Sequence, residues 1–216
     1  MGTDVNQTIK FVVFPKVGGL RAILGMQSGQ LLQVSCLGAQ CFPSEYHFFA
    51  ASANTRSAAF STGRMISLEL WPFQHANIAT LFAVAWSTGI VGLFSASEPS
   101  PLHRWDVRAE IVKLLWSSER PAVFFVITRS GRVFGYDLLQ STSSASLEFR
   151  VQTTGDVVDA AISNESILAL GSGNGSVSIH TVNEQLRMPL VDEQEEVAEL
   201  LNLTPKLKKI GVDTNV

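Results

Sequence analysis

The histidines and cysteines of this chain are the residues that could bind a metal ion or act as nucleophiles. They are His47, His75, His103 and His180, with Cys36 and Cys41. No two of the histidines have the spacing that brings metal ligands together on one helix or hairpin, and no further cysteine completes a zinc site. We therefore expect ordinary packed or surface histidines, and two free thiols in preference to a disulfide or half of a metal site.

Three aspartates and a glycine-rich loop are the candidates for acid–base catalysis and for phosphate binding. Asp156 and Asp159 could act with Asp137 as paired acids, but Asp137 ends a strand-like run, where a structural role explains it better. The loop at 171–175, GSGNG, lacks the lysine and the following helix of a phosphate-binding loop, and its Asn-Gly pair is typical of a hairpin turn. The sequence therefore predicts no enzyme, no catalytic residue, no cofactor and no metal site, and it identifies no partner-binding residue.

The composition limits the class of protein and the class of partner. Of the 216 residues, 46% are hydrophobic and 16% are charged, which is typical of a chain with a large core. The net charge is −3 and the basic residues do not cluster, so we expect neither nucleic acid nor an anionic membrane surface as a partner. We find no secretory signal at the N-terminus and no apolar run long enough to span a bilayer, which favours a cytoplasmic protein without membrane insertion.

The stretch 111–139 shows which elements would position these residues. It reads as three strands, 111–116, 122–128 and 132–138, which are rich in β-branched and aromatic residues and are separated by turns. The middle strand is apolar without alternation through residue 127, so both of its faces must be covered. The third strand ends in Tyr136-Asp137, at the position where a WD-repeat blade carries Trp-Asp. These features predict one blade of a β-propeller.

The same strand–turn–strand pattern recurs along the chain. Its turn glycines are Gly29, Gly89, Gly131 and Gly175, separated by 60, 42 and 44 residues. WD-type blades repeat about every 40–45 residues, so the first interval contains an insertion, which we place at 37–63. The prediction is an all-β, WD40-type propeller portion of about four blades of antiparallel strands, at about 6–52, 57–106, 107–152 and 153–190. Because closed propellers of this class most often have about seven blades, four would leave an open arc that further chain or a partner would cover.

Some segments outside the regular strands bear on packing. Residues 46–51 could form the outer strand of the first blade, or the aromatic residues at 46–49 could form a docking surface. Residues 98–105 read as a connection into the third blade, and 147–152 as its outer strand. The tryptophans at strand ends favour packing between blades. They are Trp71, Trp86, Trp105 and Trp116.

A short helix is expected after the last blade, at 191–204, followed by a tail at 205–216. Asp192 and Glu195 have the spacing of a capping box, and lysines follow the end of the helix, as the helix dipole favours. Its apolar stripe is Val197, Leu200 and Leu201. This stripe favours a helix that packs on the propeller over one that is free to bind a partner.

Residues 105–140 carry the most specific sequence pattern, WDVRAEIVKLLWSSERPAVFFVITRSGRVFGYDLLQ. This stretch resembles the last repeats of dynein intermediate chains, and most of all those of the ciliary dynein-2 that drives retrograde intraflagellar transport. The matching elements are Trp116-Ser117, Arg120-Pro121, the strand at 122–127, Ser130-Gly131 and 136–140, with Trp71-Pro72-Phe73 one blade earlier. The sequence departs from the WD pattern at Ala109-Glu110, where Gly-His often stands, and at Ser130, where Asp is usual.

The resemblance implies a non-catalytic scaffold subunit that binds the dynein heavy chain and other dynein-2 subunits. Such a protein would work in the cytoplasm, on the cytoskeleton and in the cilium or flagellum. Light-chain binding is not implied, because the long N-terminal region that serves it is missing from this sequence. The alternative is a WD-repeat adaptor of another multiprotein complex, in trafficking or ubiquitin transfer.

Overall fold

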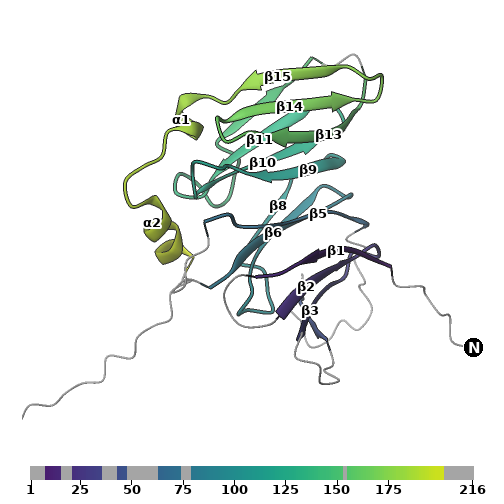
Figure 1. The fold of residues 1–216 in the computed structure, drawn as a ribbon, viewed down its shortest axis with the longest axis vertical. Coiled ribbons are helices and arrows are strands. Elements are labelled where there is room, and N and C mark those ends of the chain that lie inside the picture. Colours follow the sequence, from purple (N-terminus) through teal and green to yellow (C-terminus); the bar gives the residue numbers. More distant parts are fainter. Residues whose placement is uncertain are drawn as a thin grey trace, which may run out of the picture.

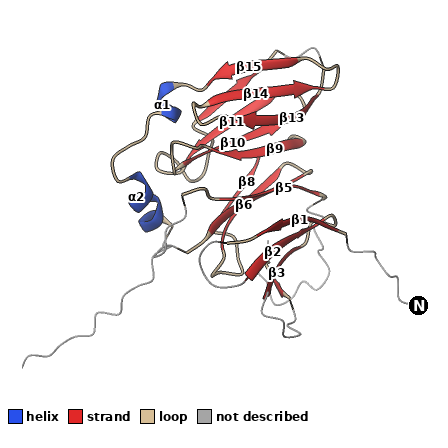
Figure 2. Cartoon of the chain, viewed as in Figure 1, coloured by secondary structure: helices blue, strands red, loops and turns tan. Residues whose placement is uncertain are grey.

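The computed structural model describes residues 8–15, 21–35, 43–47, 63–73, 79–152 and 155–201. These residues form four antiparallel sheets, each built from strands that follow one another along the chain (Figures 1 and 2). The first sheet consists of β1 (Ile9–Val13), β2 (Arg21–Met26), β3 (Leu31–Ser35) and β4 (Ser44–Glu45). The second consists of β5 (Met65–Leu70), β6 (Leu81–Trp86), β7 (Ile90–Ser95) and β8 (His103–Asp106).

The third and fourth sheets continue this order. The third consists of β9 (Ile111–Trp116), β10 (Val123–Thr128), β11 (Arg132–Asp137) and β12 (Leu147–Arg150). The fourth has the strands β13 (Val157–Ile162), β14 (Ile167–Ser172) and β15 (Val177–Thr181). Two helices follow, α1 (Glu184–Arg187) and α2 (Glu193–Leu200). The expected fold class, a portion of a propeller with a short C-terminal helix, is confirmed.

The four turn glycines occupy equivalent positions in the four sheets. Each donates its backbone N–H to the carbonyl three residues earlier, over 3.0, 3.1, 3.0 and 2.9 Å in chain order. Their φ angles are 95°, 94°, 78° and 85°, a left-handed conformation that glycine adopts without steric cost. The glycines that repeat along the sequence therefore mark the same turn in each of the four sheets.

A second backbone hydrogen bond also recurs in every sheet. The residue just after the second strand donates to the residue just before the first strand. The pairs are Gln27–Thr8 at 2.8 Å, Ser87–Arg64 at 2.9 Å, Arg129–Glu110 at 2.9 Å and Gly173–Asp156 at 2.8 Å. This bond fixes the first strand of each blade against the second, so the four sheets are copies of one blade.

The core lies between blades and not within a single sheet. Every residue of β6 and of β10 is buried, which confirms that these second strands are covered on both faces. The largest cluster joins the second and third blades, and smaller clusters join the first to the second and the third to the fourth. A single blade could not bury these side chains, so each blade is stable only against its neighbours.

Two outer strands differ from the sequence prediction. The fourth strand of the first sheet is β4, Ser44–Glu45, and not 46–51; residues 48–51 lie outside the described residues. Tyr46 follows β4 and packs edge-on against Phe82 and Phe94 of the second blade, at ring-centroid distances of 5.3 and 5.7 Å. Residues 103–106, read as part of a connection, form β8. Its only buried side chain is Trp105, so the pattern of a strand is weak.

Asp192 is the N-cap residue of α2, as predicted, but the predicted capping box is not formed. Asp192 has φ 59° and ψ 17°, in the left-handed region, and its side chain accepts no hydrogen bond from the helix. The buried face of α2 also differs from the predicted stripe: Val197 and Leu201 are buried, but Leu200 is 44% exposed and Ala198 takes its place. These buried residues join the cluster between the second and third blades, which confirms that the helix packs on the propeller.

Candidate functional site

Those histidines considered for metal binding that the structure describes lie in different blades. His47, His103 and His180 belong to the first, second and fourth blades, and His75, Cys36 and Cys41 lie outside the described residues. Among the residues that the structure describes, no group of three or more histidines, cysteines, aspartates and glutamates could hold a metal ion. The arrangement therefore supplies no set of metal ligands in the described ranges.

The three candidate aspartates each face a different basic side chain. Asp137 Oδ2 lies 2.9 Å from Arg120 Nη1, and Asp159 Oδ1 lies 3.6 Å from Lys113 Nζ. Asp156 Oδ2 lies 3.8 Å from Nη1 of Arg129, which also pairs with Glu110. The glycine-rich loop is the hairpin turn between β14 and β15, closed by Ser172 and Ser176 in a 2.8 Å backbone hydrogen bond. The contacts of Asp156 and Asp159 join the fourth blade to the third, and that of Asp137 lies within the third blade; the three aspartates form no acid–base pair with one another.

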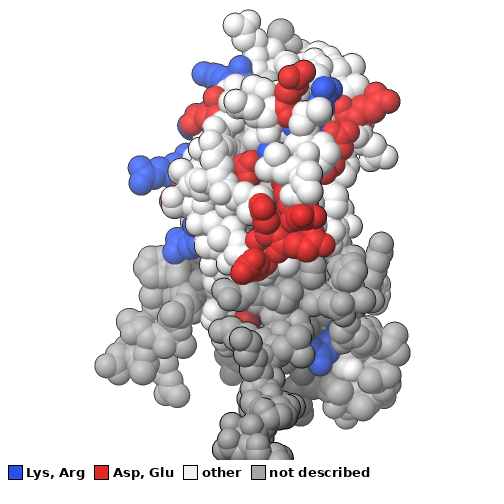
Figure 3. Space-filling view, turned by 90° about the vertical axis from the view of Figure 1, so that its left-hand side faces the viewer, with Lys and Arg blue, Asp and Glu red and all other residues white. Residues whose placement is uncertain are grey.

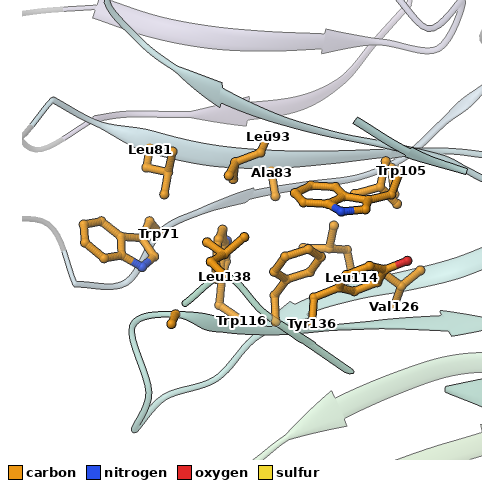
Figure 4. Close-up of a cluster of buried hydrophobic side chains, with 14 of the residues drawn as sticks. Trp71, Leu81, Ala83, Leu93, Trp105, Leu114, Trp116, Val126, Tyr136 and Leu138 are labelled. Carbon is orange, nitrogen blue, oxygen red and sulfur yellow. The ribbon is translucent and has the colours of Figure 1, made fainter. Parts of the chain in front are cut away.

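The four tryptophans connect neighbouring blades, as the sequence predicted. Each indole N–H donates to a backbone carbonyl of an adjacent blade. The acceptors are Pro121 for Trp71 at 2.8 Å, Gly29 for Trp86 at 2.9 Å, Thr142 for Trp105 at 3.0 Å and Glu69 for Trp116 at 3.4 Å. Figure 4 shows three of these rings in the apolar layer between the second and third blades.

A buried charge cluster, which we call the Arg120 cluster, consists of Arg120, Asp137 and Glu193. Arg120 Nε donates to both oxygens of Glu193, at 3.0 and 3.1 Å, while its Nη1 contacts Asp137 and the carbonyl of Gln185. The Arg120 and Glu193 side chains are 3% and 1% exposed. The cluster thus joins the third blade to both C-terminal helices.

Backbone donors complete the surroundings of the Glu193 carboxylate. The N–H groups of Ala122 and Leu190 donate to its two oxygens, each over 3.1 Å. Burial alone would lower the pKa of Arg120, but its hydrogen bond to Glu193 and the charges of Asp137 and Glu193 raise it above its ordinary value. Arg120 therefore stays charged, and the carboxylate of Glu193 fixes the start of α2 on the third blade.

Sequence reasoning missed this cluster. Arg120 and Glu193 are 73 residues apart, and neither spacing nor local pattern connects them. The Arg-Pro step at 120–121 was noticed only as part of a family resemblance. The one local signal was an aspartate at the end of the third strand, which needs a partner when it is buried.

The surface offers two kinds of contact region. On α2, Asp192, Glu195, Glu196 and Glu199 are exposed, and Figure 3 shows acidic side chains gathered on this side of the molecule. On the fourth blade the exposed large apolar side chains are Val158, Val177 and Ile179. None of the helices in the described ranges is long and apolar enough to cross a membrane.

The described residues form an incomplete β-propeller of repeated sheets. Tryptophan contacts join neighbouring blades, and the C-terminal segment packs on the third blade. No protein-family model matches the chain. Over 131 residues, 56% of its length, the chain is 29% identical to cytoplasmic dynein 2 intermediate chain 1 of Homo sapiens. Over 144 residues, 62% of its length, it is 24% identical to cytoplasmic dynein 2 intermediate chain 1 of Mus musculus.

These alignments cover 12% and 14% of the two relatives, so the chain spans about an eighth of the length of the curated relatives it matches. They confirm the resemblance to dynein-2 intermediate chains that residues 105–140 carry in the sequence.

Proposed function

We propose that the chain is a non-catalytic WD-repeat scaffold subunit of the dynein-2 motor. In this role it binds the dynein heavy chain and other dynein-2 subunits, supports motor assembly, and serves retrograde intraflagellar transport in the cytoplasm, on the cytoskeleton and in the cilium. The observation that carries the proposal is the 29% identity over 131 residues to a cytoplasmic dynein 2 intermediate chain 1.

The way the chain uses its reactive side chains supports a scaffold role. Charged groups that could serve catalysis are engaged in pairs between strands or helices, as in the Arg120 cluster and the Lys113–Asp159 pair. The indole N–H groups are likewise engaged between blades. A rigid stack of this kind presents loops and blade edges in fixed positions, which is what a subunit that binds other proteins requires.

Affinity purification from ciliated cells tests the proposal. The tagged full-length protein is expected to bring down the dynein heavy chain together with other dynein-2 subunits, and to accumulate at cilia by fluorescence microscopy. The control is a chain with Glu193→Ala and Arg120→Ala, in which α2 is no longer fixed to the third blade. If the tagged protein instead brings down trafficking or ubiquitin-transfer components and no dynein heavy chain, the result contradicts the role in the motor and supports that of an adaptor.

A further inference from the structure

The segment that connects α1 to α2 exposes apolar side chains. Its residues 188–191 have the sequence MPLV, and we call them the 188–191 loop. Met188 is 57%, Leu190 54% and Val191 85% exposed. Single exposed apolar residues are ordinary on a protein surface, whereas several on one short segment mark a site of interaction.

One guanidinium holds both ends of this loop. Arg120 donates through Nη1 to the carbonyl of Gln185, which precedes the loop, and through Nε to the carboxylate of Glu193, which follows it. The N–H of Leu190 also donates to Glu193, over 3.1 Å. Pro189 restricts the backbone between these contacts. The loop is therefore held in one conformation, and a partner that binds it does not bear the cost of ordering it.

The helices on either side of the loop are docked on the propeller. Leu186 of α1 belongs to the apolar cluster between the third and fourth blades. Val197, Ala198 and Leu201 belong to the cluster between the second and third blades. Of the described residues that form these clusters, none belongs to the 188–191 loop. The apolar side chains of the loop thus remain outside the core that its flanking helices complete.

Acidic side chains surround the loop. The exposed acidic residues nearest to it along the chain are Glu184, Asp192, Glu195 and Glu196. Arg187 is the one basic residue in the described segment 184–201. Figure 3 shows the acidic side chains gathered on this side of the molecule. A surface of this charge attracts a basic surface and repels an anionic membrane or a second copy of itself.

We propose that the 188–191 loop inserts its apolar side chains into a cleft of a partner protein whose rim carries lysine or arginine side chains. The exposed apolar residues require an apolar cleft, and the acidic residues around them require a basic rim. The inference rests on the proposed function, because it takes the dynein-2 heavy chain as this partner. The Arg120 cluster then has a role in binding, since it fixes the loop in the conformation that the partner binds.

Methionine oxidation tests whether the loop is accessible in the free protein and covered in the complex. In the full-length protein, dilute hydrogen peroxide should oxidise Met188 quickly and Met65, which is 0% exposed, slowly, as measured by mass spectrometry of peptides. The purified heavy-chain tail should slow the oxidation of Met188 alone. Slow oxidation of Met188 in the free protein overturns the proposal, because the chain then covers the loop itself, for instance with Lys206, Lys208 and Lys209.

Binding of the heavy-chain tail to variants of the full-length protein tests the apolar contact. Met188→Ser and Val191→Ser together should raise the dissociation constant roughly tenfold or more, as the loss of central apolar contacts does. Both side chains are exposed, so the melting temperature should not change. The matched control is Leu200→Ser, 44% exposed near the other end of α2, which should leave the dissociation constant unchanged.

A charge reversal tests the basic rim. Glu196→Lys should slow association at low salt roughly threefold or more, and it should reduce the dependence of the association rate on salt. Glu98→Lys makes the same change of charge at an exposed position of the second blade and should leave the rate unchanged. Faster association of Glu196→Lys overturns the proposal, because the partner surface is then acidic.

The outcomes separate this contact from the scaffold role. Binding of the wild type that the loop variant does not weaken, or that Leu200→Ser weakens as much, overturns the proposed contact and leaves the scaffold role intact. No binding of the wild type to the heavy-chain tail contradicts the scaffold role, and the proposed contact with it.

Discussion

Arg120 and Glu193 form a buried ion pair, with Nε 3.0 Å from Oε1, although 73 residues separate them in the chain. The pair fixes the beginning of α2 to the turn that precedes β10. The pair thereby holds α2 where Val197, Ala198 and Leu201 pack into the apolar cluster between the second and third blades. The C-terminal segment is thus part of the propeller core.

The first prediction concerns this ion pair. Glu193→Ala leaves the Arg120 guanidinium buried without its carboxylate partner, which should lower the free energy of unfolding by about 3–5 kcal/mol. Urea denaturation followed by tryptophan fluorescence measures the change. Glu196→Ala removes an exposed carboxylate of the same helix and should change the free energy by less than about 0.5 kcal/mol. Equal midpoints for the two variants would show that the pair does not stabilise the fold.

The second prediction concerns Glu69 of β5. Burial raises its pKa above 4.5, although the hydrogen bond from Ser67 and the charge of Lys113 oppose this rise. Because the folded state holds the proton more tightly than the unfolded state, Glu69 contributes stability below pH 4.5, and this contribution is lost as the pH rises through the folded pKa. Glu69→Gln should therefore match the wild type at low pH and be more stable than it at pH 7. Thermal unfolding across this pH range checks the sign; a variant that is less stable at pH 7 would contradict it.

The third prediction compares two indole hydrogen bonds between the second and third blades. Trp71→Phe leaves the carbonyl of Pro121, now 2.8 Å from the indole nitrogen, without its buried donor, which should cost about 1–3 kcal/mol. Trp116→Phe removes a longer bond, 3.4 Å to the carbonyl of Glu69, and should cost less. Guanidinium denaturation followed by circular dichroism gives both values, and the reverse order would mean that these bonds do not set the stability of the junction.

The fourth prediction uses two of the turn glycines. Gly89 and Gly175 have similar φ angles of 94° and 85°, so alanine is strained at both, by about 1–2 kcal/mol. At Gly89 a Cβ would also lie 2.8 Å from the carbonyl oxygen of Ala109, whereas at Gly175 nothing lies within 4 Å. Gly89→Ala should thus lower the melting temperature more than Gly175→Ala. The same loss for both variants would show that the contact with Ala109 relaxes without cost.

The blades could be predicted from the sequence because their signals are local. The second strand β6 is apolar at every position and β10 at every position but its last, and the turn glycines mark each hairpin, at intervals of 42 and 44 residues after the first. The strand β8 was missed because it is four residues long and has one buried side chain, Trp105. For so short a segment, pairing with β7 and packing against the third blade decide the conformation, and neither can be read from the local pattern.

The contacts of the C-terminal segment could not be predicted for a related reason. Asp192 occupies the N-cap position of α2 but its side chain forms no capping hydrogen bond, and the buried carboxylate of its neighbour Glu193 accepts hydrogen bonds from Ala122 and Leu190 instead. The partner of Glu193 is an arginine that only the folded chain brings near.

The most direct test of the proposed scaffold role is binding between purified components. The full-length protein, immobilised by a tag, is exposed to the purified tail of the dynein-2 heavy chain, and biolayer interferometry records association over a concentration series. We predict saturable binding that is lost when Glu193→Ala and Arg120→Ala release α2 from the third blade. A full-length, cooperatively folded protein that shows no binding to the heavy-chain tail would contradict the role proposed for this chain.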